Sequence, residues 1–478
     1  MTFVKHALWI VIIYIDFIPQ VKPAAEFDFE TTDFSKIANT PAFVDKTLFI
    51  KVFIEHNKTS LITAPPGFGK STILNMLKTF LEIEVYNTGA PKTNAYYLKE
   101  QVRDTRNYKL FDDNMFKISE DANMMKNHFG KTPVLSVSLK CEKTVNSFDD
   151  ALEFFKYVVH DCYKQYRYLG RSEKLGIDQR QYIETWCDHK TYRMFGKHRV
   201  LSGLRDLSEF LYRHFNDKTV FVLIDDHDSV IKSAMLNVTD DGQLDDIVKL
   251  SVGLINSLLK NNRRHVHGGL ITGVSDIPLF GSGLTDKDDC DTIMKYRFLG
   301  DHPFVDFFGL TKHEVDGLLV YPELKLGESV VDTAKAMYSG FTSKKGVEVA
   351  NLYSILNFLK YGEIKNYWQT FNPVPNLDEA LKVPLIKKSI EKMLTDDSIN
   401  IEISTNLTLN DIIGMRNFLN NPQSQAVSVA IKYFSFLFEE GYLAYALDQG
   451  HLQNQVNGKN AVRMPNDEIK EIFTQALK

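Results

Sequence analysis

The segment that most constrains the fold of this chain joins a short apolar run to a helical pattern. The run Thr59–Thr63 is β-prone, and it leads into Ala64-Pro-Pro-Gly67-Phe68-Gly69-Lys70-Ser71-Thr72. Apolar residues then recur at helical spacing over 73–81. A strand, a glycine-containing loop and a helix in this order are typical of a phosphate-binding P-loop. The sequence therefore predicts an α/β fold that carries this loop.

Phosphate binding assigns a task to each part of the loop. Its amides and the helix N-terminus direct partial positive charge at an anion. Gly67 and Gly69 let the backbone approach phosphates closely because they carry no Cβ. Lys70 can reach the β- and γ-phosphates of ATP, and the Ser71 hydroxyl can bind Mg²⁺. The expected cofactor-binding residues are Pro66, Gly67, Phe68, Gly69, Lys70, Ser71 and Thr72.

Two other interpretations of this loop stay open. Ala64 stands where the motif expects its first glycine. The segment could therefore be an ordinary turn, or a P-loop that has lost its ligand. A dinucleotide-binding loop fits less well, because its third glycine would fall at Thr72.

A P-loop that hydrolyses ATP needs a carboxylate from a neighbouring strand. The continuous apolar run Thr219–Ile224 is typical of a strand buried on both faces, and it ends in Asp225-Asp226-His227-Asp228. We expect Asp225 to hold Mg²⁺ and Asp226 to deprotonate the attacking water. Many P-loop ATPases use the longer Glu there, so catalysis by Asp226 could be weak. The alternative is an acidic loop that only caps the strand.

A third segment adds hydroxyl groups. The pattern over 245–260 predicts an amphipathic helix, and Gly268–Ser275 follows as another buried strand. In ATPases with such an inserted strand, a polar residue at its tip senses the γ-phosphate. Thr272 is the first candidate and Ser275 the second, although a hydroxyl at a strand end is as often a turn residue. The expected catalytic residues are thus Lys70, Asp226 and Thr272.

Composition narrows the class of protein. The chain has 478 residues, 44% of them hydrophobic and 24% charged, so it can bury a sizeable core over two to three domains. Its net charge of −5 lacks the basic excess typical of nucleic-acid-binding proteins. Its four cysteines show no CxxC spacing and predict neither a disulfide framework nor structural zinc.

The N-terminus predicts export. Lys5 and His6 precede the apolar run Ala7–Ile15, which is far shorter than the roughly 20 residues of a membrane-spanning helix. A basic start, a short apolar core and small residues near position 25 fit a secretory signal peptide. We expect residues 1–25 to be this peptide and the mature protein to be secreted, without a transmembrane segment. A first strand of a cytosolic domain is the alternative.

Beyond the P-loop, the chain resembles the AAA-ATPase-like family of P-loop proteins. The similarity runs from about Phe29 to the C-terminus, and it implies a parallel sheet made of the P-loop strand, Pro133–Leu139, the acidic strand and the sensor strand. It rests on the P-loop and on Phe43–Thr47, His128–Val134, Leu223–Asp228, Thr272–Ser275, Phe308–Val315, Gly441–Leu443 and Pro465–Ile469.

Departures from the family pattern concern the site. The family loop reads Arg-Pro-Arg-Arg-Phe-Gly-Lys-Ser and also lacks the first glycine, so Ala64 is less unusual than it seems. Two of its arginines are replaced by Pro66 and Gly67, so any phosphate contact they make is lost. Asp226 replaces a Glu and His227 replaces a Tyr.

The expected organisation is a signal peptide over 1–25, a P-loop domain over 26–309 and a mostly helical domain over 310–478. Helices are expected over 147–168, 201–215, 353–359, 377–394 and 427–440, with a capping box at Thr311–Glu314. Together with the predicted signal peptide, the resemblance leads us to expect a secreted, eukaryotic-type member of this family. The nuclease domain of bacterial relatives follows the Pro465–Ile469 landmark and is expected to be absent.

Two functions remain open at this stage. The first is a Mg²⁺-dependent ATPase that couples hydrolysis to motion of the helical domain. The second is a secreted binding module, gated by nucleotide or free of it, with little turnover. The sequence names neither the protein target nor the oligomeric state, and a homo-oligomer stays open. Candidates for an arginine finger are Arg263, Arg264 and Arg297.

Overall fold

A computed structural model describes the chain from residue 31 onward, with gaps. The predicted signal peptide, residues 1–25, lies outside the described residues. Within the described part, no helix is both long and apolar enough to cross a membrane. The described residues are 31–40, 42–95, 99–260, 262–275, 293–320, 326–395, 398–403, 408–421, 427–448, 451–452 and 459–478.

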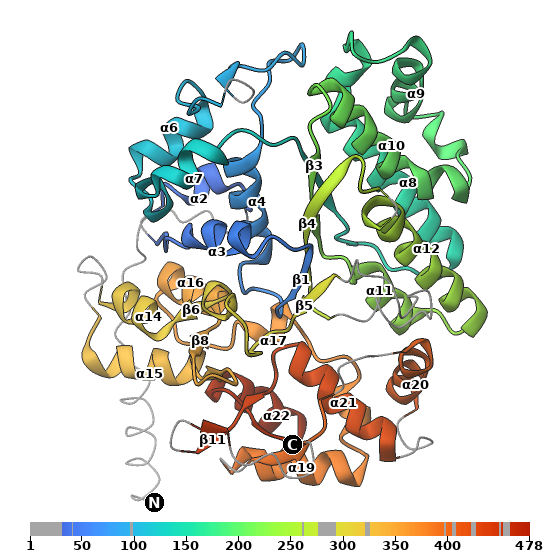
Figure 1. The fold of residues 1–478 in the computed structure, drawn as a ribbon. Coiled ribbons are helices and arrows are strands. Elements are labelled where there is room, and N and C mark those ends of the chain that lie inside the picture. Colours follow the sequence, from blue (N-terminus) through green and yellow to red (C-terminus); the bar gives the residue numbers. More distant parts are fainter. Residues whose placement is uncertain are drawn as a thin grey trace, which may run out of the picture.

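A five-stranded parallel sheet organises the first half of the chain (Figure 1). The strand order β2-β3-β4-β1-β5 places the sensor strand between the acidic strand and the P-loop strand. The predicted α/β fold is confirmed, and the structure adds a strand, β5, that the sequence did not predict. The strands are β1 (Ser60–Thr63), β2 (Val134–Ser138), β3 (Val220–Asp225), β4 (Val266–Gly273) and β5 (Met294–Tyr296).

Helices cover both faces of this sheet (Figure 1). The predicted helices over 147–168, 201–215 and 245–260 correspond to α8, α10 and α12. On one side lie α2 (Phe34–Ile37), α3 (Leu48–His56), α4 (Lys70–Leu81), α6 (Arg106–Asp113) and α7 (Ala122–Asn127). On the other side lie α8 (Phe148–Gln165), α9 (Ile177–Cys187), α10 (Lys197–His214), α11 (Ser229–Asn237) and α12 (Asp241–Leu259).

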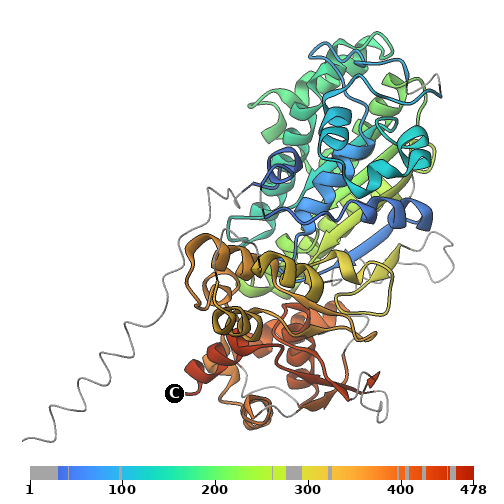
Figure 2. The same ribbon diagram turned by 90° about the vertical axis from the view of Figure 1, so that its left-hand side faces the viewer.

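The rest of the chain is mainly helical, and both ribbon views place it below the sheet (Figures 1 and 2). Its helices are α14 (Lys312–Leu319), α15 (Glu328–Tyr338), α16 (Leu352–Tyr361), α17 (Trp368–Phe371), α18 (Leu377–Ala380), α19 (Pro384–Leu394), α20 (Leu409–Asn420), α21 (Val427–Glu439) and α22 (Asp467–Ala476).

Small antiparallel pairings accompany these helices. They join β6 (Leu310–Thr311), β8 (Glu348–Ala350) and β7 (Phe341–Thr342), then β10 (Ala444–Tyr445), β13 (Asn460–Arg463) and β9 (Ile399–Ile401), and finally β11 (Leu447–Asp448) and β12 (His451–Leu452).

Two helix predictions in this region have different outcomes. The capping box is present, because Thr311 caps α14 and its amide donates to Glu314 Oε2 at 2.7 Å. The single helix expected over 377–394 is wrong. The structure divides it into α18 and α19, and Pro384 begins the second helix. Proline has no amide hydrogen to continue a preceding helix, but it is well suited to a first helical position.

The apolar core extends through both halves of the chain. One cluster of buried residues includes Leu61 of β1, Phe68 of the loop, Trp368 of α17 and Phe473 of α22. The two halves therefore share packing near the P-loop. The boundary between 309 and 310 stays a prediction.

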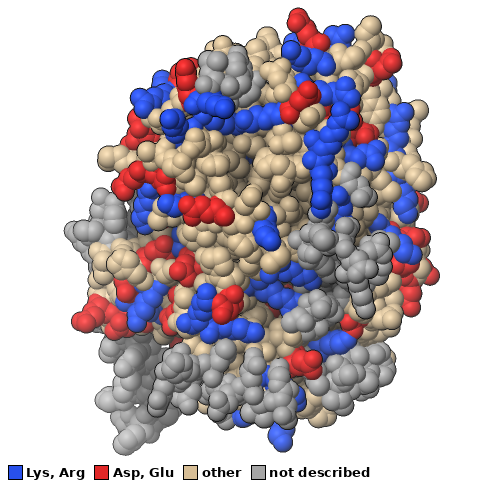
Figure 3. Space-filling model, viewed as in Figure 1, with Lys and Arg blue, Asp and Glu red and all other residues tan. Residues whose placement is uncertain are grey.

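On the face of the molecule in Figure 3, acidic and basic side chains both occur across the surface, as the small net charge suggests.

Candidate functional site

The loop between β1 and α4 has the backbone that its glycines predict. Gly67 has φ 76° and Gly69 has φ 86°, in the left-handed region that side chains disfavour. Gly69 is the N-cap of α4, and its carbonyl accepts the amide of Ile73 at 3.0 Å. At Gly67 a Cβ would also lie 2.8 Å from the Cβ of Tyr353. Both glycines are therefore required for the path of the loop.

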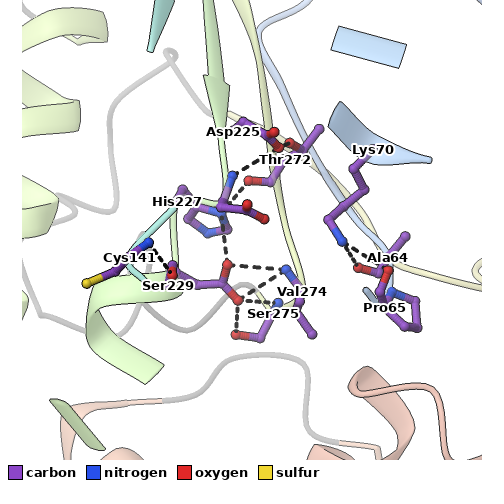
Figure 4. Close-up of polar contacts among 12 residues, drawn as sticks. Ala64, Pro65, Lys70, Cys141, Asp225, His227, Ser229, Thr272, Val274 and Ser275 are labelled. Carbon is purple, nitrogen blue, oxygen red and sulfur yellow. Dashed lines mark hydrogen bonds and ion pairs between the residues drawn. The ribbon is translucent and has the colours of Figure 1, made fainter. Parts of the chain in front are cut away.

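The Lys70 ammonium lies inside this loop. Lys70 is only 6% exposed, and its Nζ donates to the carbonyl oxygens of Ala64 at 2.7 Å and Pro65 at 3.0 Å (Figure 4). It is the first residue of α4, so its charge adds to the partial positive charge of the helix N-terminus. The loop thus presents a concentrated positive potential to an anion.

Asp225 ends β3 and contacts the neighbouring strand. Its Oδ1 accepts the hydroxyl of Thr272 at 2.6 Å and the amide of Asp226 at 3.1 Å (Figure 4). Thr272 is fully buried, and its hydroxyl proton is used in this bond. The structure therefore brings together Asp225 and Thr272, two predicted site residues from different strands. A role for Thr272 as a sensor of the γ-phosphate stays a prediction.

Asp226 differs from Asp225 in both backbone and environment. Its φ of 53° lies in the left-handed region, which is uncommon for a residue other than glycine. Burial raises the pKa of Asp226 to about 6, and the negative charge of Asp225 acts in the same direction, while Lys70 opposes the shift. A carboxyl group that titrates near neutral pH is suited to accept and release a proton.

Asp228 links the acidic strand to the sensor strand, a role that sequence reasoning missed. Its carboxylate accepts the amides of Val274 and Ser275 and the Ser275 hydroxyl, at 2.8–3.2 Å (Figure 4). Burial alone would raise its pKa, but His227 and these hydrogen bonds outweigh burial, so the pKa of Asp228 is lowered. Ser275, the second sensor candidate, is therefore hydrogen-bonded to Asp228.

Gly273 makes this close approach between strands possible. A Cβ at Gly273 would lie 2.2 Å from His227 Nδ1 and 2.6 Å from Asp228 Oδ1. No side chain fits at these distances. The Thr272–Ser275 and Leu223–Asp228 motifs are thus two halves of one packed unit, which explains why a glycine follows Thr272.

One cavity of about 620 Å³ joins most of the predicted site residues. All of Pro66–Thr72 and Asp226 line it, together with Lys46 and Lys140. Lys140 follows β2, and the amide of the preceding Leu139 donates to the Asp225 carbonyl at 2.9 Å. The volume lies in the range of about 300–1,000 Å³ that is usual for small-molecule sites.

The remaining wall of the cavity is apolar and comes from two distant parts of the chain. Phe34, Phe43 and Val44 contribute from the N-terminal segment, and α16 and α17 contribute from the other side. We call Tyr353 and Phe371 the aromatic wall. Their rings stack with centroids 3.9 Å apart and planes 15° apart. Sequence reasoning missed the aromatic wall, because helical spacing does not distinguish a core residue from a cavity residue.

The described residues that line the cavity include none of the three arginine-finger candidates. Arg263 and Arg264 precede β4, at the opposite end of that strand from Thr272, and Arg297 directly follows β5. Their role stays a prediction.

Comparison with known proteins identifies the loop and both strand ends as parts of one family pattern. The model of a family described as "Predicted AAA-ATPase" matches residues 29–281, more than half of the chain. The match includes the P-loop, Asp225–Asp228 and Thr272–Ser275, whereas the aromatic wall lies beyond it. No curated protein matches the chain.

Proposed function

Because the chain belongs to the AAA-ATPase-like family, we propose that it binds ATP with Mg²⁺ and hydrolyses it, coupling turnover to movement of its helical C-terminal region. The observation that carries this proposal is the cavity of about 620 Å³, which unites the predicted cofactor-binding residues Pro66–Thr72 with Asp226. A nucleotide is a ligand of suitable size and charge for such a cavity.

The two ends of the cavity suit the two ends of ATP. In this proposal the phosphates bind at the N-terminus of α4, where Lys70, loop amides and the helix dipole supply positive charge. The base and ribose extend to the apolar side, which Phe34, Phe43 and the aromatic wall line. Base–aromatic stacking contributes roughly 1–3 kcal/mol in other proteins, so this side can add affinity.

The donor atoms fit Mg²⁺. Ser71 lines the cavity at the start of α4, and Asp225 ends β3 directly before Asp226, which lines the cavity. Hydroxyl and carboxylate oxygens are the ligands that Mg²⁺ prefers, and it is usually bound together with substrate phosphates. The two hydrogen bonds of Asp225 use Oδ1, so Oδ2 can face a cation or a metal-bound water. When bound, Mg²⁺ would neutralise charge on the β- and γ-phosphates.

Asp226 is the proposed general base. Its side chain lines the cavity with Lys70, and its raised pKa near 6 lets it take a proton from water at neutral pH. General-base contributions are typically 10²–10⁴-fold in rate. Thr272 supports this arrangement by fixing Asp225, which holds the amide of Asp226.

A second function is favoured by the same residue. Asp226 has a shorter side chain than the Glu of the family pattern, and its left-handed backbone fixes the direction of that short reach. If water cannot be aligned, the protein would bind nucleotide without appreciable turnover. It would then act as a nucleotide-gated module that presents its C-terminal region to a protein target.

Phosphate release at saturating Mg²⁺-ATP separates these two functions. For an ATPase, Asp226→Asn should reduce turnover by about 10²–10⁴-fold and Asp226→Glu should retain or increase it. Lys70→Ala serves as the background. Wild-type release no faster than this background, with a gain in Asp226→Glu, would identify a binding module. Equal turnover of Asp226→Asn and wild type would refute the role of Asp226.

Export through residues 1–25 is a separate part of the proposal. It rests on the basic start and short apolar core of that segment. Expression of the full chain in a eukaryotic secretory host should release protein that begins near Glu26. N-terminal sequencing checks this, and a protein that keeps Met1 and stays in the cytosol would contradict it.

A further inference from the structure

A single buried carboxylate of the C-terminal helix connects to both helices of the aromatic wall. Glu468 of α22 is 1% exposed. Its Oε1 accepts the amides of Tyr367 at 2.8 Å and Trp368 at 2.9 Å. Its Oε2 accepts the Ser354 hydroxyl at 2.9 Å. Three donors from outside α22 therefore converge on one side chain.

Each donor belongs to, or directly precedes, one of the two helices that line the cavity. Ser354 follows Tyr353 on α16, and Trp368 is the first residue of α17, which ends at Phe371. An acceptor at the first amides of a helix serves as its cap. Glu468 thus caps α17 from another helix and at the same time anchors α16 through Ser354.

The two helices that contact Glu468 also contact the P-loop. The amide of Tyr353 donates to the Gly67 carbonyl at 3.1 Å. The Trp368 ring lies 6.1 Å from the ring of Phe68, with an edge-on geometry. Both helices that Glu468 holds therefore touch residues of the phosphate-binding loop.

We propose that Glu468 is a positioning residue for the nucleotide site, because it fixes α16 and α17 so that Tyr353 and Phe371 form one wall of the cavity. This inference rests on the proposed nucleotide binding. It makes the C-terminal helix, which lies beyond the matched family segment, a determinant of nucleotide affinity.

Removing the carboxylate should weaken binding through the wall. Glu468→Ala leaves two buried amides and a buried hydroxyl without their acceptor, and these groups must seek new partners. The wall then shifts, and the bound base loses part of its stacking on Tyr353 and Phe371. We expect Mg²⁺-ATP to bind Glu468→Ala roughly tenfold or more weakly than wild type in calorimetric titration.

Glu468→Gln is the matched conservative variant. A glutamine oxygen at the Oε1 position still accepts both amides, and its amide group can donate to the Ser354 oxygen. We expect Glu468→Gln to bind Mg²⁺-ATP within about twofold of wild type. If hydrogen bonding by residue 468 positions the wall, Glu468→Gln keeps the affinity for Mg²⁺-ATP that Glu468→Ala loses.

A double-mutant cycle separates positioning from general damage. Phe371→Ala removes one ring of the wall, so Glu468→Ala should add less than twofold in that background, since coupled residues are not additive. Full additivity of the two effects, or unchanged affinity in a folded Glu468→Ala protein, would overturn the proposal.

Ser354→Ala keeps the test decisive if Glu468→Ala does not fold. Ser354→Ala deletes only the hydroxyl that donates to Oε2. It should weaken Mg²⁺-ATP binding measurably when Phe371 is present, but not in the Phe371→Ala background. An equal effect in both backgrounds would overturn the proposal. Failure of the proposed function looks different, because wild type would then bind no Mg²⁺-ATP.

Discussion

The two walls of the cavity differ in chemistry and in origin. The P-loop wall is polar and charged, and it comes from the loop after β1, from α4 and from Asp226 after β3, all within the matched segment. The opposite wall is apolar and aromatic, and α16 and α17 supply it from the part of the chain beyond the matched segment. The first wall defines which reaction the site can perform. The second closes the site and ties it to the C-terminal helix.

This contrast predicts that changes in the two walls have separable effects. A change on the polar wall should alter chemistry or phosphate contacts with little effect on the rest of the fold. A change behind the aromatic wall should alter stability and the affinity for the whole nucleotide.

Replacing Glu468 by Gln should change how stability depends on pH. Burial raises the pKa of Glu468 to about 7 from an ordinary value of 4.5, although its hydrogen bonds oppose the shift. The folded protein therefore keeps a proton that the unfolded chain releases, so stability falls as pH rises from about 4.5 to 7. Relative to Glu468→Gln, wild type should lose roughly 3 kcal/mol over this range.

Denaturant unfolding of both proteins between pH 5 and pH 8 measures this difference. The comparison cancels the other titrating groups, because both proteins share them. A constant difference between the two unfolding free energies across the range would contradict the raised pKa of Glu468.

On the polar wall, turnover should follow the protonation of Asp226. Its raised pKa of about 6 means that the base is lost as pH falls through this value. Below pH 6 the rate should drop about tenfold per unit, hence about 100-fold by pH 4. The pH dependence of kcat/KM for Mg²⁺-ATP gives the profile, because this quantity reports the groups of the free protein. The residual rate of Asp226→Asn should not show this fall below pH 6. The same fall in that variant would mean that a group other than Asp226 causes it.

Gly67 lies where the two walls meet, so an added methyl group should affect both. Gly67→Ala places a Cβ 2.8 Å from that of Tyr353 in a left-handed backbone. We expect a loss of about 1–3 kcal/mol in unfolding free energy, together with weaker Mg²⁺-ATP binding.

Gly317→Ala is the matched control for this change. Gly317 lies within α14, and a Cβ there would meet no atom within 4 Å. Alanine should stabilise that helix by up to about 1 kcal/mol. Equal unfolding free energies for Gly67→Ala and Gly317→Ala would show that the contact between the loop and α16 is unimportant.

The polar wall could be predicted from the sequence because its signals are local. Glycines beside Lys70 require a special backbone whatever surrounds them, and Asp225 and Asp226 follow an apolar run that is typical of a buried strand. Parallel strands that carry such groups at their ends bring them to one edge of the sheet. The α/β fold follows from the same patterns.

The aromatic wall could not be predicted because its signals are not local. Tyr353 and Phe371 have the spacing of ordinary core residues, and only the packing of α16 and α17 against the loop makes them line a cavity. Glu468 stands in the Pro465–Ile469 landmark, yet nothing beside it in sequence indicates burial. β5 has three residues, which is too short for a periodic pattern.

Calorimetric titration with two ligands tests the central claim most directly. Adenosine lacks the phosphates that Lys70 should contact, whereas Mg²⁺-ATP uses both walls. Lys70→Ala should therefore strongly weaken the binding of Mg²⁺-ATP and leave the affinity for adenosine unchanged. Phe371→Ala should weaken the binding of both ligands by a similar factor. If Mg²⁺-ATP binds Lys70→Ala as tightly as wild type, the nucleotide does not occupy this cavity and the two-wall site is refuted.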